Sequence, residues 1–255
     1  MDQYKDIALW LSAAAANARP GQQGNNLIFQ EGSTLYMEQW TNDGLSGKTP
    51  IVEGVRDETP VALIVDNKIF VLNANSVLTC HVKPQGDGKP GELWPEENLG
   101  DGNIQIHPDS QLFALQSGGQ VIIFYQDTDG DLSSIKESNG IWTVSKLLAT
   151  SPTLGTPLGY FPHLGKEHLL YVTEDDLVRA LVKEEGEEEW KDQTFSPARL
   201  QGSVSNLVAI PTQEDDEPEG LSVFGLVSSQ LVMINGTTED AVVLGMVKNR
   251  TYLGT

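Results

Sequence analysis

Short apolar stretches recur along the chain, and each is followed by two β-rich arms around a polar turn. The apolar stretches lie at residues 7–10, 61–64, 112–115, 158–161 and 207–210. The paired arms that follow them span residues 27–38, 69–79, 122–135, 169–180 and 222–234. Apolar and β-branched arms joined by Gly, Asn, Asp or Ser are typical of β-hairpins. The pattern therefore predicts five copies of one inner strand followed by one hairpin.

The repeat length indicates how these copies assemble. The anchor residue of the third strand falls at Leu35, Val77, Leu132, Leu177 and Leu231, with separations of 42, 55, 45 and 54 residues. A four-stranded propeller blade has about this length. A fourth, outer strand is expected at residues 50–55 in the first copy and at Trp142 and Trp190 in the third and fourth. We therefore expect an all-β, five-bladed β-propeller in a single domain, residues 1–255. Its blades should lie at about 7–58, 59–109, 110–155, 156–204 and 205–248.

Charge narrows the range of partners. The chain has 36 acidic and 16 basic side chains and a formal net charge of −20. Such a surface repels phosphate backbones, so we expect no nucleic-acid partner. The acidic runs at residues 174–176, 184–189 and 214–219 are expected to be solvated loops.

One cysteine and one apolar run indicate in which cellular compartment the protein is expected. A single cysteine, Cys80, forms no internal disulfide, which favours a reducing, cytoplasmic location. The run at residues 7–16 resembles the core of an export signal, but Asp2 and Asp6 make its flank acidic, whereas export signals carry positive charge there. No run reaches the roughly 18 to 20 apolar residues of a membrane helix, so no membrane insertion is expected.

The third copy carries a family resemblance. Its stretch IFYQDTDGDL at residues 123–132, followed by Gly140, Ile141 and Trp142, resembles the blade of fungal fucose-specific lectins, which have six blades. In those lectins an arginine at the start of the second strand, a glutamate on the third and a nearby aromatic hold the sugar. The arginine position carries Asn26, Lys68, Ile122, His168 and Leu221, and the glutamate position carries Met37, Thr79, Ser134, Arg179 and Met233. No copy keeps the charged pair, so fucose recognition is not expected.

A lectin-like scaffold without its sugar residues also resembles the fungal pericyclases of tropolonic sesquiterpene biosynthesis. This resemblance implies a cofactor-independent hetero-Diels–Alderase of secondary metabolism. Its reactants would be a tropolone ortho-quinone methide and a humulene-type sesquiterpene alcohol, both apolar small molecules. Two alternatives stay open: a lectin-like carbohydrate- or ligand-binding module without catalysis, and an intracellular interaction propeller. The oligomeric state is also open, and a homodimer is one option.

Known catalytic motifs give no competing prediction. The chain has no G-x-S-x-G elbow, H-E-x-x-H pair or P-loop. The acidic stretch from Asp127 to Asp131 differs from a calcium loop in the place of its glycine, and Ser138 stands where that loop has its last glutamate. We therefore expect a plain hairpin turn there, and no metal or organic cofactor.

A cycloaddition needs no nucleophile, so the candidate residues follow from position alone. Inner-strand ends and the second and third strands supply them. The candidate catalytic residues are His163, Gln116 and Lys68, and the candidate substrate-binding residues are Trp10, Tyr36, Tyr160, Phe161 and Arg179. The alternatives are packing between blades for the aromatic side chains, and solvated or salt-bridged positions for Lys68, His163 and Arg179.

Overall fold

The computed structural model describes residues 2–16, 26–41, 44–64, 68–84, 92–97, 99, 104–117, 120–138, 141–184, 186–212, 220–236 and 239–254. Their strands form five antiparallel sheets, the blades of a β-propeller fold, which confirms the predicted fold class. The chain divides into two compact units. Unit 1 comprises Met1–Ser12 and Leu147–Thr255, and unit 2 comprises Ala13–Lys146.

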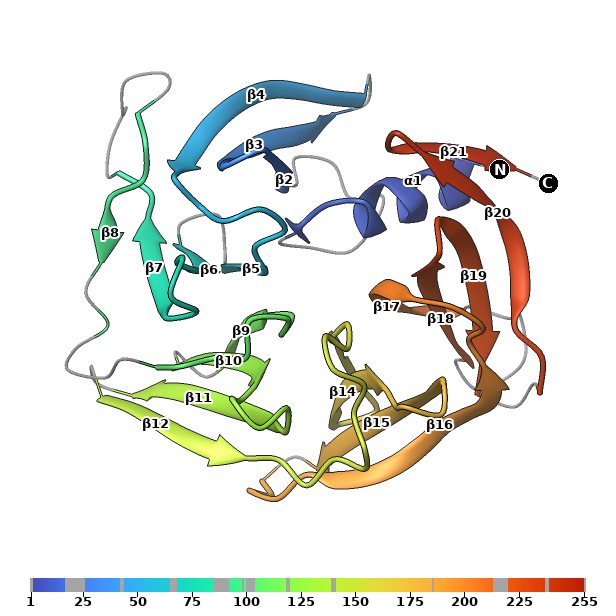
Figure 1. The fold of residues 1–255 in the computed structure, drawn as a ribbon. Coiled ribbons are helices and arrows are strands. Elements are labelled where there is room, and N and C mark those ends of the chain that lie inside the picture. The colour runs from blue at the N-terminus through green and yellow to red at the C-terminus, as the bar shows by residue number, and fades with distance from the viewer. Residues whose placement is uncertain are drawn as a thin grey trace. The chain divides into compact units, whose positions relative to one another are not determined.

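Unit 2 contains the first three blades (Figure 1). The first blade consists of β1 (Ala15–Ala16), β2 (Asn26–Glu31), β3 (Thr34–Thr41) and β4 (Gly44–Glu53). The second consists of β5 (Val61–Ile64), β6 (Lys68–Leu72), β7 (Leu78–Val82) and β8 (Glu96–Glu97). The third consists of β9 (Phe113–Ser117), β10 (Gln120–Gln126), β11 (Leu132–Ser138) and β12 (Ile141–Lys146).

Unit 1 contains one helix and two blades (Figure 1). The helix is α1 (Asp2–Leu11). The fourth blade consists of β13 (Gly159–His163), β14 (Lys166–Val172), β15 (Leu177–Glu184) and β16 (Lys191–Arg199). The fifth consists of β17 (Val204–Thr212), β18 (Gly220–Val227), β19 (Gln230–Asn235), β20 (Val242–Lys248) and an additional outer strand, β21 (Thr251–Gly254).

All five predicted hairpins are present, and three share one turn. In the second, third and fourth blades the backbone N–H of the first turn residue donates to the carbonyl four residues later, from Asn73 to Val77, Asp127 to Asp131 and Thr173 to Leu177. The Asp127 carboxylate also accepts from the N–H groups of Asp129 and Asp131. Asp127 thus organises a hairpin, as predicted. Among the described residues no group of three or more His, Cys, Asp or Glu could hold a metal ion.

The first inner strand was wrongly predicted, because residues 7–10 belong to the helix α1. Ile7, Ala8 and Leu11 are fully buried against the fifth blade, and their spacing follows the helical period rather than the alternation of a strand. The inner strand of the first blade is instead β1, where Ala15 pairs with Ile28.

Within each unit the core lies between neighbouring sheets. In unit 2 one apolar cluster joins the first and second blades and another joins the second and third. In unit 1 one cluster joins the fourth and fifth blades and another joins the fifth blade to α1. Neighbouring blades of one unit therefore bury the sheet faces that they turn toward each other, as expected for a propeller repeat.

The acidic runs are exposed where they are described. Residues 174–176 form the exposed tip of a hairpin, and residues 184 and 186–189 are exposed as well. Residues 214–219 lie outside the described residues. No described helix is long and apolar enough to cross a membrane.

Candidate functional site

The inner strand of the fourth blade carries three of the predicted site residues and brings two of them, Phe161 and His163, onto one face. Strands β13 and β14 form a hairpin in which Phe161 pairs with His168 and Tyr160 pairs with Leu169. Alternate residues of a strand face opposite sides of the sheet. Phe161 and His163 therefore share one face with His168, and Tyr160 lies on the other.

Phe161 and His168 form a stacked pair. Their ring centroids lie 4.6 Å apart with planes inclined by 6°, and the His163 ring lies 6.3 Å from that of His168. Burial is the main cause that lowers the pKa of His168, so the imidazole is neutral at physiological pH. Its Nδ1 atom is buried and has no hydrogen-bond partner among the residues that the structure describes. The half-buried His163 lies next to this pair.

On the opposite face, Tyr160 contacts Glu167, which forms an ion pair with Lys183. Burial and a hydrogen bond with Glu167 raise the pKa of Tyr160, so its phenol stays protonated. The Glu167 carboxylate pairs with Lys183 at 2.5 Å, and the Lys183 ammonium lies 5.1 Å from the ring centre of Trp190. Tyr160 is thus a fixed neutral aromatic side chain.

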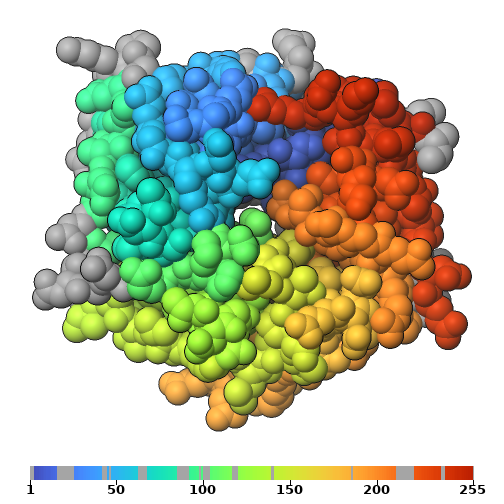
Figure 2. Space-filling view, in the orientation of Figure 1, coloured from blue at the N-terminus to red at the C-terminus, as the bar shows by residue number. Residues whose placement is uncertain are grey.

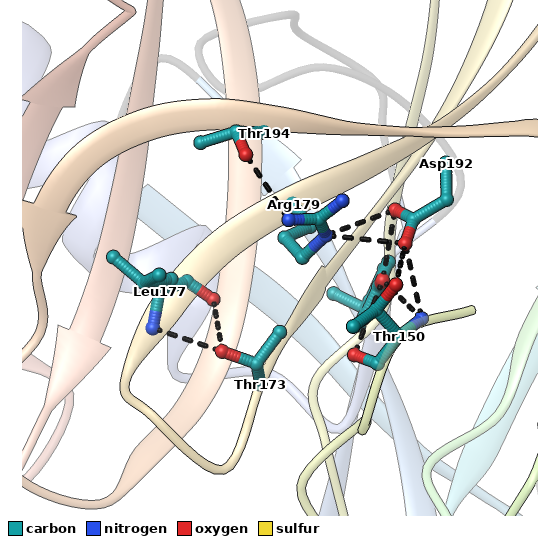
Figure 3. A network of polar contacts seen from close by, with 7 residues as sticks. Thr150, Thr173, Leu177, Arg179, Asp192 and Thr194 are labelled. Carbon is teal, nitrogen blue, oxygen red and sulfur yellow. Dashed lines mark hydrogen bonds and ion pairs between the residues drawn. The ribbon is translucent and has the colours of Figure 1, made fainter.

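Arg179 belongs to a separate polar network in the same blade (Figure 3). Its Nε donates to both oxygens of Asp192 at 3.0 and 3.2 Å, and its guanidinium also reaches Thr194 at 3.0 Å. Asp192 accepts further bonds from the Tyr171 hydroxyl at 2.9 Å and from the N–H and hydroxyl of Thr150. Arg179 therefore holds Asp192 in place, and Asp192 in turn binds Thr150.

The remaining predicted residues lie elsewhere. Trp10 is half-buried on α1 against the fifth-blade cluster. In unit 2, Gln116 is exposed on β9. Tyr36 lies on β3 with the Lys48 ammonium 4.3 Å from its ring centre. Lys68 begins β6 and pairs with Glu97 at 2.6 Å. These four residues lie on separate elements.

The strand pairing corrects the sequence alignment to the lectin repeat. In the third blade the glutamate position, Ser134, lies opposite Phe124. The residues in the same place are Cys80, opposite Phe70, and Ala180, opposite Leu170. They replace Thr79 and Arg179 in the alignment. In the fifth blade Met233 lies opposite Phe224, which moves the arginine position from Leu221 to Ser222. In the second and fourth blades the alignment slipped because it anchored the third strand one residue early, at Val77 and Leu177, which are the last residues of their turns.

With this correction, the second blade shows a charged pair that the sequence alignment missed. Lys68 stands at the arginine position, and its partner Glu97 also lies 3.8 Å from the thiol of Cys80, which stands at the glutamate position. Burial opposes the charged form of Lys68, but Glu97 outweighs it and raises the pKa of Lys68. Burial raises the pKa of Cys80 to about 12. Trp142 of the third blade lies edge-on to Phe70, with ring centroids 6.2 Å apart.

Comparisons with known proteins agree with this architecture. No family model and no curated protein matches the chain. Solved lectin structures do match. Aleuria aurantia lectin, a six-bladed β-propeller with a novel fucose recognition mode, gives a TM-score of 0.67 at 18% identity, over 92% of this chain and 77% of the lectin. SapL1 lectin, solved with α-methyl fucoside, gives 0.65 at 16%, over 92% and 79%. A lectin from Burkholderia pseudomallei gives 0.62 at 14%, over 94% and 70%.

What these proteins share with the chain is the fold. The identities are too low to carry over a ligand or an activity.

Sequence reasoning missed two residues that shape these sites, Glu97 and Asp192, and the role of a third, His168. His168 was identified at the arginine position, but its stacking on Phe161 depends on the pairing of β13 with β14. Glu97 comes from a two-residue strand and Asp192 from the start of an outer strand. Neither stands in a local motif, so only the fold places it beside its cation.

Proposed function

We propose that this protein is a cofactor-independent pericyclase. The reaction is an intermolecular hetero-Diels–Alder cycloaddition between a tropolone ortho-quinone methide and a humulene-type sesquiterpene alcohol. The observation that carries the proposal is the Phe161–His168 stack with His163 beside it. At the place where the fucose lectins carry a charged arginine, this blade has an imidazole that burial keeps neutral. Neutral rings suit apolar reactants, because they need no charge to be desolvated when substrate covers them.

The reaction needs a surface that orients the two reactants and one hydrogen-bond donor. The four-atom heterodiene of the quinone methide and the two carbons of the alkene form one C–C and one C–O bond together, and no proton, electron or leaving group is exchanged. Holding both reactants in one orientation lowers the barrier by at most about 7 to 11 kcal/mol. A donor aimed at the carbonyl oxygen lowers it further, because negative charge grows there as the diene accepts electron density.

The residues of the fourth blade divide these roles. Phe161 supplies aromatic surface on the face of the sheet that it shares with His163. Tyr160 lies on the other face of this sheet, so it stays a prediction as a substrate contact. The half-buried His163 is the group whose ring N–H can donate to the quinone-methide oxygen. Gln116 and Lys68 stay predictions as catalytic residues, as do Trp10, Tyr36 and Arg179 as substrate contacts.

The test compares variants that change the donor or the wall. Loss of the donor in His163→Ala should slow the enzymatic reaction by up to about a hundredfold, and His163→Asn should restore part of the rate because it keeps an N–H group. Phe161→Leu should lower the enantiomeric purity of the product, because the pose loosens. The control is Glu188→Gln, an exposed position outside the cluster.

The measurement is chiral chromatography of products from chemically generated quinone methide, with circular dichroism to establish folding of each variant. Folded variants that all keep the native rate and enantiomeric ratio would move the site away from the fourth blade.

A second candidate function, a lectin-like ligand-binding module without catalysis, is favoured by one observation. Lys68, Glu97 and Trp142 place two opposite charges and an aromatic side chain near the second-blade position that corresponds to a lectin sugar site. The 2.6 Å ion pair already occupies the ammonium, so a sugar would have to displace it. We therefore expect fucose to bind no more tightly than about millimolar. Calorimetry that finds micromolar affinity, lost in Lys68→Ala, would make the binding module the better account.

A further inference from the structure

The side chains of the fourth and fifth blades, both in unit 1, pack beside one another (Figure 2). A groove lies between these two blades. It runs between the end of β16 and strands β18 to β20 and encloses about 590 Å³. That volume lies within the roughly 300–1,000 Å³ of small-molecule sites. Phe161, His163 and His168 do not line the groove, and neither do Lys68 and Glu97.

The floor of the groove is aliphatic. Leu200, Val227 and Val232 line it, and each is at least 95% buried. Val243 lies opposite Val232 in the sheet, yet it is 45% exposed and extends this apolar surface up the wall. An apolar body placed here would remove exposed aliphatic surface from water, which is favourable.

The two walls carry opposite charges. On the fourth blade, the Arg199 guanidinium donates one hydrogen bond to the backbone carbonyl of Asp175 at 2.5 Å. A guanidinium has five N–H donors. On the fifth blade, Glu239 and Asp240 are exposed, and neither carboxylate has a side-chain partner among the residues that the structure describes. The Gln230 amide is likewise uncommitted within that part of the chain.

From this arrangement we infer that the groove binds a small zwitterion with an aliphatic body, of the kind that a short apolar peptide presents. The carboxylate of the ligand pairs with Arg199, its ammonium pairs with Glu239 and Asp240, and its aliphatic side chains cover the valine floor. A neutral ligand would leave these charges unused, and an anion would meet the two carboxylates. The inference is independent of the proposed cycloaddition, because it uses other residues on another part of the blade.

Matched ligands and matched variants test it together. The probes are leucyl-leucine, its N-acetyl form without the ammonium and its amide without the carboxylate, titrated by calorimetry into the full chain. We expect leucyl-leucine to bind and each blocked form to bind about fivefold more weakly, the loss that one half-exposed charge pair accounts for.

The protein side should mirror these losses. Arg199→Gln should weaken leucyl-leucine but leave the amide unchanged, and Asp240→Asn should weaken leucyl-leucine but leave the N-acetyl form unchanged. The control, Glu174→Gln, removes an exposed charge of the fourth blade outside the groove and should change nothing. No binding of leucyl-leucine at 10 mM (about the weakest affinity worth assigning), or equal binding of all three probes, would overturn the inference. Losses that do not match between probe and variant would do the same.

Discussion

At the scale of single residues, one carboxylate organises the polar side of the fourth blade. Asp192 accepts from Arg179, Tyr171 and Thr150, and its side chain is 11% exposed, that of Arg179 20% (Figure 3). Burial is the main cause that raises the pKa of Tyr171 to about 12, so the phenol donates to Asp192 at every physiological pH.

Asp192→Asn keeps the size of the side chain but removes its charge. Arg179 would then be largely buried without a counter-ion, and we expect a loss of about 2 kcal/mol in the free energy of unfolding. Urea denaturation measures it, with the exposed Asp109→Asn as control. An Asp192 variant as stable as that control would mean that the network contributes nothing.

His168 gives the fourth blade a dependence on acid. Burial lowers its pKa in the folded state, so folding favours the neutral ring. The stabilisation is present above the ordinary histidine pKa of about 6.5 and is lost as pH falls through the lower folded value. We expect stability to drop as pH falls below about 6.5 in the native protein and to drop less in His168→Phe, whose ring still stacks on Phe161. Equal slopes in urea titrations of the two proteins would contradict this assignment.

The sequence alone made Tyr160, Phe161 and His163 candidate site residues, but it did not show which neighbouring side chains hold them in place. Their neighbours His168 and Glu167 follow from a two-residue turn at Leu164 and Gly165, both with positive φ, which sets the pairing of β13 and β14. A one-residue shift in register moves a side chain to the other face of the sheet. The alignment anchored the third strand of the fourth blade one residue early, at Leu177, so Arg179 took the lectin position that the strand pairing gives to Ala180.

At the scale of elements, the helix α1 replaces the strand that the repeat predicted. Its apolar stretch is too short for composition to separate helix from strand, and only contact with the fifth blade decides between them. The Asn206 amide also donates to the Leu11 carbonyl at 2.6 Å, which satisfies one open acceptor at the end of the helix. The five hairpins, by contrast, were predictable because their turns carry local signals.

The docking of α1 has a measurable consequence. Leu11 is fully buried in the cluster between α1 and the fifth blade, so Leu11→Ala should leave a cavity and cost about 2 to 5 kcal/mol. Gln3→Ala, at an exposed position of the same helix, should change stability by less than about 0.5 kcal/mol. Thermal and urea unfolding followed by circular dichroism compare them. If both variants matched the native protein, the helix would not be docked in solution.

At the scale of the whole molecule, the repeat predicted the fold class and the comparisons share it. Five hairpins at a regular spacing specify stacked blades, whatever the residues at the ligand positions. That explains how lectins with under 20% identity match the fold while no blade here keeps the lectin arginine and glutamate. Function does not follow from this scale, because different sites are built on one scaffold.

The most direct test of the central claim compares the native protein with no protein at all. Quinone methide generated chemically in the presence of the sesquiterpene alcohol reacts slowly by itself, and the uncatalysed product should be a stereochemical mixture. We predict that the native protein, without added metal or cofactor, accelerates formation of one stereoisomer and raises its enantiomeric excess well above the background. Product that matches the protein-free control in both rate and enantiomeric ratio would contradict the pericyclase account.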